Sequence, residues 1–176
     1  FIVAIIGIFL ILAILFNSYS QPLLVLASFP FALIGVVWAF HFHGYSLSFF
    51  ALTGALGLMG VIVNDSLVMV SHLNYIKQKS ANLEDKIVWI ARGSRDRLRA
   101  VVLTTLTTMA GVLPLAYGVG GTDEFLQPMV LALGYGLMFG TLLTLVLLPC
   151  MYLMNYDFIN MLGRIKAKFS RKKAVV

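Results

Sequence analysis

The chain has 176 residues, of which 60% are hydrophobic and only 11% are charged, and its mean hydropathy is +0.95. Soluble domains carry about 25% charged residues, so this composition excludes an ordinary water-soluble domain and indicates a membrane protein. The net charge of +6 does not indicate nucleic-acid binding, because all thirteen basic residues lie in two blocks, 77–99 and 164–173. Such clustering is typical of the cytoplasmic flanks of membrane spans.

Five segments are apolar enough to be membrane spans, for which a helix needs about 20 residues. They are residues 1–16, 22–42, 49–73, 99–118 and 127–153. The first is short and begins at Phe1 rather than at a methionine, so we expect a fragment whose first helix is truncated. The sequence therefore predicts an all-α membrane protein with five transmembrane helices, in a transmembrane domain over residues 1–163.

The basic residues also predict an orientation. The connection at about 74–98, with Arg99 beside it, carries seven Lys or Arg, whereas the connections at 41–48 and 118–126 carry none. Because cytoplasmic loops are enriched in Lys and Arg, we expect the connection at about 74–98 and the basic tail, residues 164–176, to be cytoplasmic. The tail is expected to be attracted to anionic lipid.

Within the basic connection, residues 82–97 are predicted to form a short helix on the membrane surface. Asn82 is suited to be its N-cap, and Trp89 is a candidate anchor at the membrane interface. The alternative is a solvated, charged linker.

Asn64 and Asp65 stand in the middle of the third span. A central Asp costs about 2.5–3.5 kcal/mol for membrane insertion, which offsets most of the gain from the apolar residues around it. A group this costly indicates a function by default, and here the hypothesis is proton or ion handling. The alternative is a hydrogen-bonded carboxyl group that holds helices together.

Small residues mark the helix faces that are expected to pack closely. Five glycines in the third and fifth spans are expected to do so: Gly54, Gly57, Gly60, Gly136 and Gly140. Asn64 and Ser71 lie in line with Gly57 at intervals of seven residues, so we expect this face to point into the bundle, together with Asp65.

The fourth span offers threonine hydroxyls to this face. Thr104 is one whose hydroxyl is expected to come within reach of the Asp65 carboxylate. The alternative is that each threonine bonds to a carbonyl of its own helix.

The sequence contains none of the common motifs of hydrolases, zinc proteases or phosphate-binding loops. His41 and His43 lack the further ligands that a metal site requires. We therefore predict that the chain is not an enzyme and has no catalytic residue, metal site or cofactor. His72, near the basic end of the third span, is a possible proton relay, and an interfacial histidine without that role is the alternative.

Two segments carry a resemblance to a known family. Residues 47–70, LSFFALTGALGLMGVIVNDSLVMV, resemble the tenth transmembrane helix of resistance–nodulation–division (RND) transporters, in the acriflavine-resistance, multidrug-exporter branch. Residues 97–105, RLRAVVLTT, and 111–115, GVLPL, resemble the eleventh. The resemblance covers essentially the whole chain, as helices eight to twelve of a twelve-helix protein.

The resemblance implies a C-terminal membrane part of a proton-driven efflux pump that exports amphiphilic compounds across the bacterial inner membrane. It implies that Asn64 and Asp65 occupy the counterpart of the paired aspartates on helix four, and that Thr104 and Arg97 lie along the proton path. In the best-known drug pumps the positions of Asn64 and Asp65 hold lysine and asparagine, so their ion-pair switch does not transfer to this chain.

The implied partners are the missing N-terminal half, further copies of the pump in a trimer, and membrane lipid, with no nucleic acid. The implied location is the inner membrane, with several spans and a cytoplasmic C-terminus. Two alternatives remain open at this point. One is a self-standing membrane assembly or binding module, and the other is an RND-superfamily member that exports lipids, metals or proteins.

Overall fold

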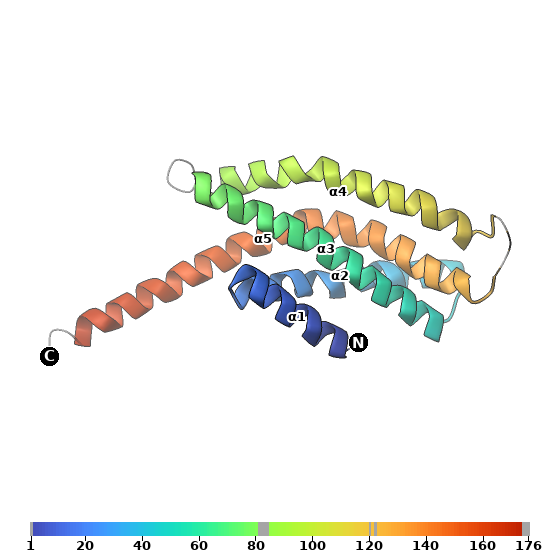
Figure 1. The fold of residues 1–176 in the computed structure, drawn as a ribbon, viewed down its shortest axis with the longest axis horizontal. Coiled ribbons are helices and arrows are strands. Elements are labelled where there is room, and N and C mark those ends of the chain that lie inside the picture. Colours follow the sequence, from blue (N-terminus) through green and yellow to red (C-terminus); the bar gives the residue numbers. More distant parts are fainter. Residues whose placement is uncertain (1, 81–84, 120, 122, 174–176) are drawn as a thin grey trace.

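The computed structural model describes residues 2–80, 85–119, 121 and 123–173, and all of their side chains except those of 80, 159, 160 and 162–173. Within these residues the chain forms five helices and no strand, which confirms the predicted all-α membrane fold (Figure 1). They are α1 (Ile2–Phe16), α2 (Ser20–His43), α3 (Phe49–Ser80), α4 (Lys86–Ala116) and α5 (Leu126–Lys173). Helices α2 to α5 are long and apolar enough to span a membrane, whereas α1 is an apolar helix of 15 residues.

Helix α5 is the centre of the bundle, because α2, α3 and α4 all pack against it, while α1 packs against α2 (Figure 1). The helix ends follow from local chemistry. Gly44 ends α2 with φ of 69° and donates its N–H to the Phe40 carbonyl. This left-handed conformation costs glycine nothing, since it has no Cβ.

The core has two parts along the length of the bundle. One, at the end where α4 begins, gathers around Trp89 and includes Val70, Leu73 and Leu148. The other joins α2, α3 and α5 through small and branched residues such as Ala32. Small side chains in the second part let the three helix backbones approach one another.

Glycines make the closest of these helix contacts. A Cβ added at Gly54 of α3 would overlap the backbone carbonyl oxygen of Met129 in α5, and one at Gly136 of α5 would overlap the Leu58 side chain of α3. At Gly140 it would lie 2.8 Å from the Cβ of Ala32 in α2.

The other two glycines that the sequence singled out are placed differently. Gly57 is exposed, and a Cβ there would lie 3.2 Å from the Leu133 side chain. Gly60 is also exposed and has no described atom within 4 Å of its Cβ position, so it makes no close helix contact among the described residues. Gly60 stands on the side of α3 that these helices leave uncovered.

The Gly54 contact predicts a stability difference between two matched variants. Gly54→Ala places a methyl group against a backbone atom that cannot turn away, so we expect a loss of about 1–3 kcal/mol. Gly60→Ala meets no described atom and gains helix propensity of up to about 1 kcal/mol, so it should be neutral or slightly stabilising where no further helix covers it. Thermal unfolding of the 176-residue chain in detergent measures both. Equal melting temperatures for the two variants would contradict the α3–α5 contact.

The structure corrects the prediction of a separate surface helix over residues 82–97. Residues 82–84, including Asn82, lie outside the described part, but from Lys86 onward the segment is continuous with the fourth span in one 31-residue helix. Trp89 is not an interfacial anchor, because only 1% of its surface is exposed and its ring meets the edges of Tyr152 and Tyr156. The burial of this large ring against α5 holds the start of α4 inside the bundle.

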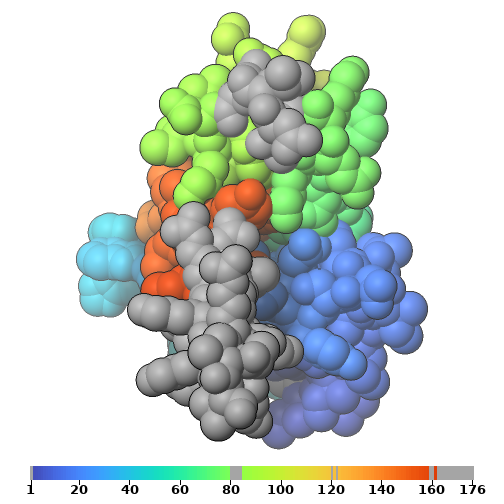
Figure 2. Space-filling view, turned by 90° about the vertical axis from the view of Figure 1, so that its left-hand side faces the viewer, coloured from blue at the N-terminus to red at the C-terminus, as the bar shows by residue number. Residues whose placement is uncertain are grey.

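Two other boundaries differ from prediction. Helix α3 continues to Ser80, and α5 continues as a helix to Lys173, through most of the segment predicted as a tail. Figure 1 shows this last part of α5 extending beyond the other helices. Seen from that end, the finish of α3 and the start of α4 lie together, with the blue N-terminal part of the chain below the end of α3 (Figure 2).

A polar clamp joins three helices near this same end. Asn74 of α3 exchanges two hydrogen bonds with Gln21 of α2, at 2.8 and 3.2 Å, and accepts a third from the Tyr152 hydroxyl of α5 at 2.7 Å. Hydrogen bonds between membrane helices contribute about 0.6 kcal/mol each on average. The clamp therefore fixes the mutual register of α2, α3 and α5 more than it adds stability.

Candidate functional site

Three consecutive polar residues at the middle of α3 point in three directions. Ser66 is buried and its Oγ lies 3.1 Å from that of Ser28 in α2. Asp65 is partly buried, and its side chain forms no hydrogen bond or ion pair with any residue that the structure describes. Asn64 is exposed. Successive helix residues are about 100° apart, so only one of the three can face the core fully.

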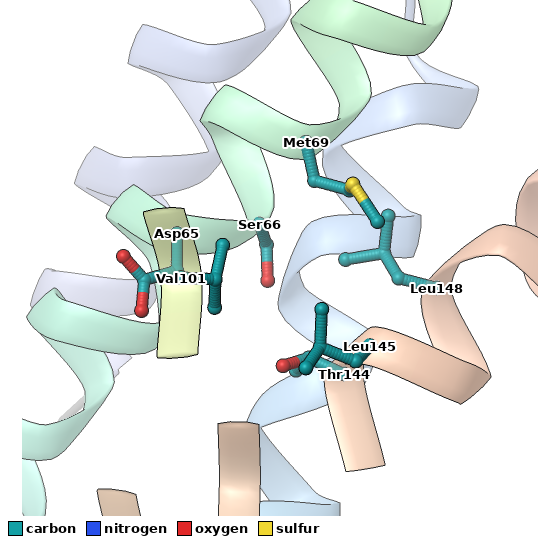
Figure 3. Close-up of a pocket in the computed structure, with 7 residues that line it drawn as sticks. All are labelled: Asp65, Ser66, Met69, Val101, Thr144, Leu145 and Leu148. Atoms are coloured by element: carbon teal, nitrogen blue, oxygen red, sulfur yellow. The ribbon is translucent and has the colours of Figure 1, made fainter. Parts of the chain in front are cut away.

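A small cavity borders Asp65 on the inner side of α3. Its volume is about 10 Å³, and it is lined by residues of α3, α4 and α5: Asp65, Ser66, Met69, Val101, Thr144, Leu145 and Leu148 (Figure 3). That is roughly the space that one water molecule needs. Figure 3 shows the Asp65 carboxylate pointing away from the hydroxyl groups of Ser66 and Thr144. The carboxylate thus stands at the edge of the described bundle.

Buried hydroxyl groups continue from this cavity between α4 and α5. The Oγ1 atoms of Thr105 and Thr141 lie 2.9 Å apart, and Thr144 donates to the Thr141 carbonyl at 3.1 Å. The sequence prediction included Thr105 among the threonines of the fourth span but missed Thr141 as its partner. Thr141 directly follows Gly140, so its position beside a glycine expected to pack closely was the feature of the sequence that could have identified it.

Thr104, which the resemblance placed on the proton path, is exposed. Its hydroxyl donates to the Val101 carbonyl of its own helix at 2.8 Å, and no hydrogen bond joins it to Asp65 among the described residues. The alternative considered for the threonines therefore holds for Thr104 in this structure. A threonine in a helix can always satisfy its hydroxyl in this local way.

Arg97 and His72 stand nearer the start of α4. The Nε atom of Arg97 is buried and lacks a hydrogen-bond partner among the described residues, and the same is true of Nε2 of His72. His72 Nε2 lies 3.7 Å from the Oδ2 atom of Asp96. Buried groups that can donate hydrogen bonds are costly unless they find an acceptor.

The small and polar line on α3 lies on the side that the described helices leave uncovered. Gly57, Asn64 and Ser71 are exposed rather than turned into these five helices, which bury the opposite face of α3. Helix α4 is uncovered to a much greater degree than α3, since only 11% of its membrane-spanning stretch is buried, against 50% for α2, α3 and α5. The outer face of α3 and α4 therefore presents Asn64, Thr104 and the edge of Asp65 without a partner helix in the described part of the chain.

An ionisable group at mid-depth in a bundle of apolar helices is typical of membrane transport proteins. The comparisons with known proteins agree with this class. The sequence model of the AcrB/AcrD/AcrF family matches residues 1–155, and the chain belongs to this family of RND efflux transporters.

Relatives include exporters of two kinds. The chain is 34% identical over 151 residues to the multidrug resistance protein MdtC of Erwinia tasmaniensis, covering 85% of this chain and 14% of that protein. It is 33% identical over 150 residues to the cobalt-zinc-cadmium resistance protein CzcA of Cupriavidus metallidurans, with the same two coverages of 85% and 14%.

A solved structure agrees with these relatives. The X-ray crystal structure of a heavy metal efflux pump superposes with a TM-score of 0.72 at 30% identity, over 84% of this chain and 14% of that one. The chain thus spans about 14% of the length of these proteins.

Proposed function

We propose that this chain is the C-terminal membrane part of a proton-driven exporter in which Asp65 binds and releases the coupling proton. The observation that carries the proposal is a carboxylate in the middle of α3 that has no partner among the described residues and borders a cavity of about 10 Å³. An ionisable group is retained at such a depth only at a cost, and proton relays in pumps are built from residues of this kind.

The uncovered face of α3 and α4 supports a site that further helices complete. Asn64 and Thr104 are exposed on this face, and the buried Nε atom of Arg97 needs an acceptor that the described residues do not provide. A buried N–H group without an acceptor costs free energy. The proposal therefore assigns the acceptor to the N-terminal half of the same transporter, whose helices would cover this face.

The names of the relatives support two candidate substrate classes. We infer export of amphiphilic compounds, as the name of the multidrug resistance protein MdtC suggests. Divalent metal export is the second candidate, and the cobalt-zinc-cadmium resistance protein and the heavy metal efflux pump support it. The transporter is further proposed to be a trimer in the bacterial inner membrane, with the basic end of α3 to α5 in the cytoplasm and in contact with anionic lipid.

Reconstituted full-length transporter tests the proposal and separates the two substrates. Liposomes with a proton gradient and a trapped pH-sensitive dye are given either a cationic amphiphile such as ethidium or a zinc salt. We expect the amphiphile to accelerate proton flux and zinc to leave it unchanged. Acceleration by zinc alone would replace the first substrate class by the second, and no acceleration by either would overturn proton-coupled export of these compounds.

A further inference from the structure

His72 and Asp96 bring two titratable side chains together between α3 and α4. His72 Nε2 and Asp96 Oδ2 are 3.7 Å apart, and 18% of the His72 side chain is exposed, against 53% for Asp96. Nε2 itself is buried without a hydrogen-bond partner in the described part of the structure. The separation is slightly too long for a hydrogen bond and short enough for an ion pair once the imidazole carries a proton.

Close packing of the two helices fixes this pair. A Cβ added at Gly93 of α4 would lie 2.9 Å from side-chain atoms of both Leu73 and Ile76, and 3.9 Å from Cδ2 of His72. Glycine at this position thus lets α4 approach α3 closely, one turn before Asp96. The pair is therefore held by backbone positions on two helices rather than by flexible loops.

The pair also lies along α3 from Asp65, toward residues that are more exposed. His72 follows Asp65 by seven residues, which is two turns and roughly 10 Å along α3, toward the end of the bundle that carries the basic residues of 77–99. Exposure rises along the same direction, from the partly buried Asp65 and His72 to the exposed Asp96. An imidazole side chain can both accept and donate a proton, so histidine is suited to a relay at this position.

Other charged groups surround the pair. On α4, Arg97 adjoins Asp96 in sequence, and Arg92 precedes it by one turn. On α3, Lys77 is directed elsewhere, since its Nζ lies 4.7 Å from the centre of the Tyr156 ring of α5. Asp96 is thus the anionic group that lies within ion-pair distance of His72.

We propose that His72, supported by Asp96, accepts the proton that Asp65 releases and passes it to water at the basic end of the bundle. The inference rests on the proposed proton-coupling function of Asp65. The Asp65 carboxyl group loses its proton through intervening water, and the imidazole gains it and pairs with the Asp96 carboxylate. Loss of the proton to bulk water then restores the neutral ring, so that one proton crosses per cycle and no charge accumulates.

Three variants of the full-length transporter, reconstituted in liposomes as above, test this relay. His72→Gln keeps a polar side chain of similar length but cannot titrate, Asp96→Asn removes the supporting charge, and His41→Gln is a matched control at the opposite end of the bundle. We expect His72→Gln to lower proton-coupled turnover about tenfold with an unchanged substrate KM. It should also abolish the dependence of turnover on pH, between about 5 and 8, in the compartment that faces the Lys- and Arg-rich end of the bundle. Asp96→Asn should lower turnover about threefold, the double variant should be no worse than His72→Gln, and the control should match the unmodified protein.

Each outcome separates this relay from the function on which it rests. If Asp65→Asn stops coupling while His72→Gln keeps the original turnover and pH profile, the relay is overturned and the role of Asp65 stands. If His72→Gln only lowers the melting temperature with the pH profile unchanged, the pair is a static brace and the relay is again overturned. If Asp65→Asn itself couples normally, the proposed function fails first.

Discussion

Replacing Asp65 by asparagine is expected to reduce proton-coupled export at least about 100-fold while leaving the transporter folded. Asparagine has nearly the same shape but cannot bind and release a proton, and positioned proton-transfer groups contribute about 10²–10⁴ in rate. The fold should tolerate the change because the Asp65 side chain has no hydrogen bond to any described residue. Dye-detected proton flux and substrate efflux in liposomes measure the effect, and thermal unfolding checks the fold.

Asp85→Asn is the matched control for this substitution. Asp85 precedes α4 as an exposed N-cap residue without a side-chain capping bond, and asparagine is an equally good N-cap. We expect this variant to export normally. Full coupling in Asp65→Asn over a range of pH would show that Asp65 only joins helices, and the proton would then have to use another group.

Trp89→Ala is expected to have the largest effect on stability, about 3–5 kcal/mol, as is usual for removing a buried aromatic side chain. The indole ring is 1% exposed, and its centroid lies 6.1 Å from that of Tyr152 and 6.3 Å from that of Tyr156. Its removal leaves a cavity where the start of α4 meets α5. Thermal unfolding of the full-length transporter in detergent measures the loss.

The neighbouring Val88 provides the control for that measurement. Its side chain is 47% exposed, so Val88→Ala should change the free energy of unfolding by less than about 0.5 kcal/mol. A similarly small effect of Trp89→Ala would mean that the ring lies in the membrane interface, as the sequence pattern suggested, and not in the core.

The helices themselves were predictable because long apolar runs leave the chain few other options in a bilayer. The start of α4 was not. Leu83, Ile87 and Ile90 recur at helical spacing, and this pattern suits a helix on the membrane surface as well as one packed on other helices. Contacts of Trp89 with Tyr152 and Tyr156, more than sixty residues away, decide between the two. Such distant partners leave no mark in a local pattern.

The candidate site was predictable to the extent that its chemistry is costly. Asp65 stood out because a carboxyl group is rare within an apolar span. The buried hydroxyl pairs Ser28–Ser66 and Thr105–Thr141 did not, because serine and threonine occur throughout membrane helices and usually bond locally. The line through Asn64 was correctly recognised as polar, but its direction depends on which side of α3 the other helices cover, and spacing alone does not determine that.

The glycine contacts described above have a consequence for motion during a transport cycle. With backbone pressed on backbone at Gly54, and side chains seated over Gly136 and Gly140, three of the helices have almost no freedom to slide or roll past one another. Helix α4 is bare on its outer face, but it contacts the other helices near both ends and in its middle, through Trp89, Thr105 and Ala116. Any displacement that accompanies protonation is therefore expected as a movement of α4 as a whole relative to the other three, measurable as a wider distance distribution between spin labels on α4 and on α2.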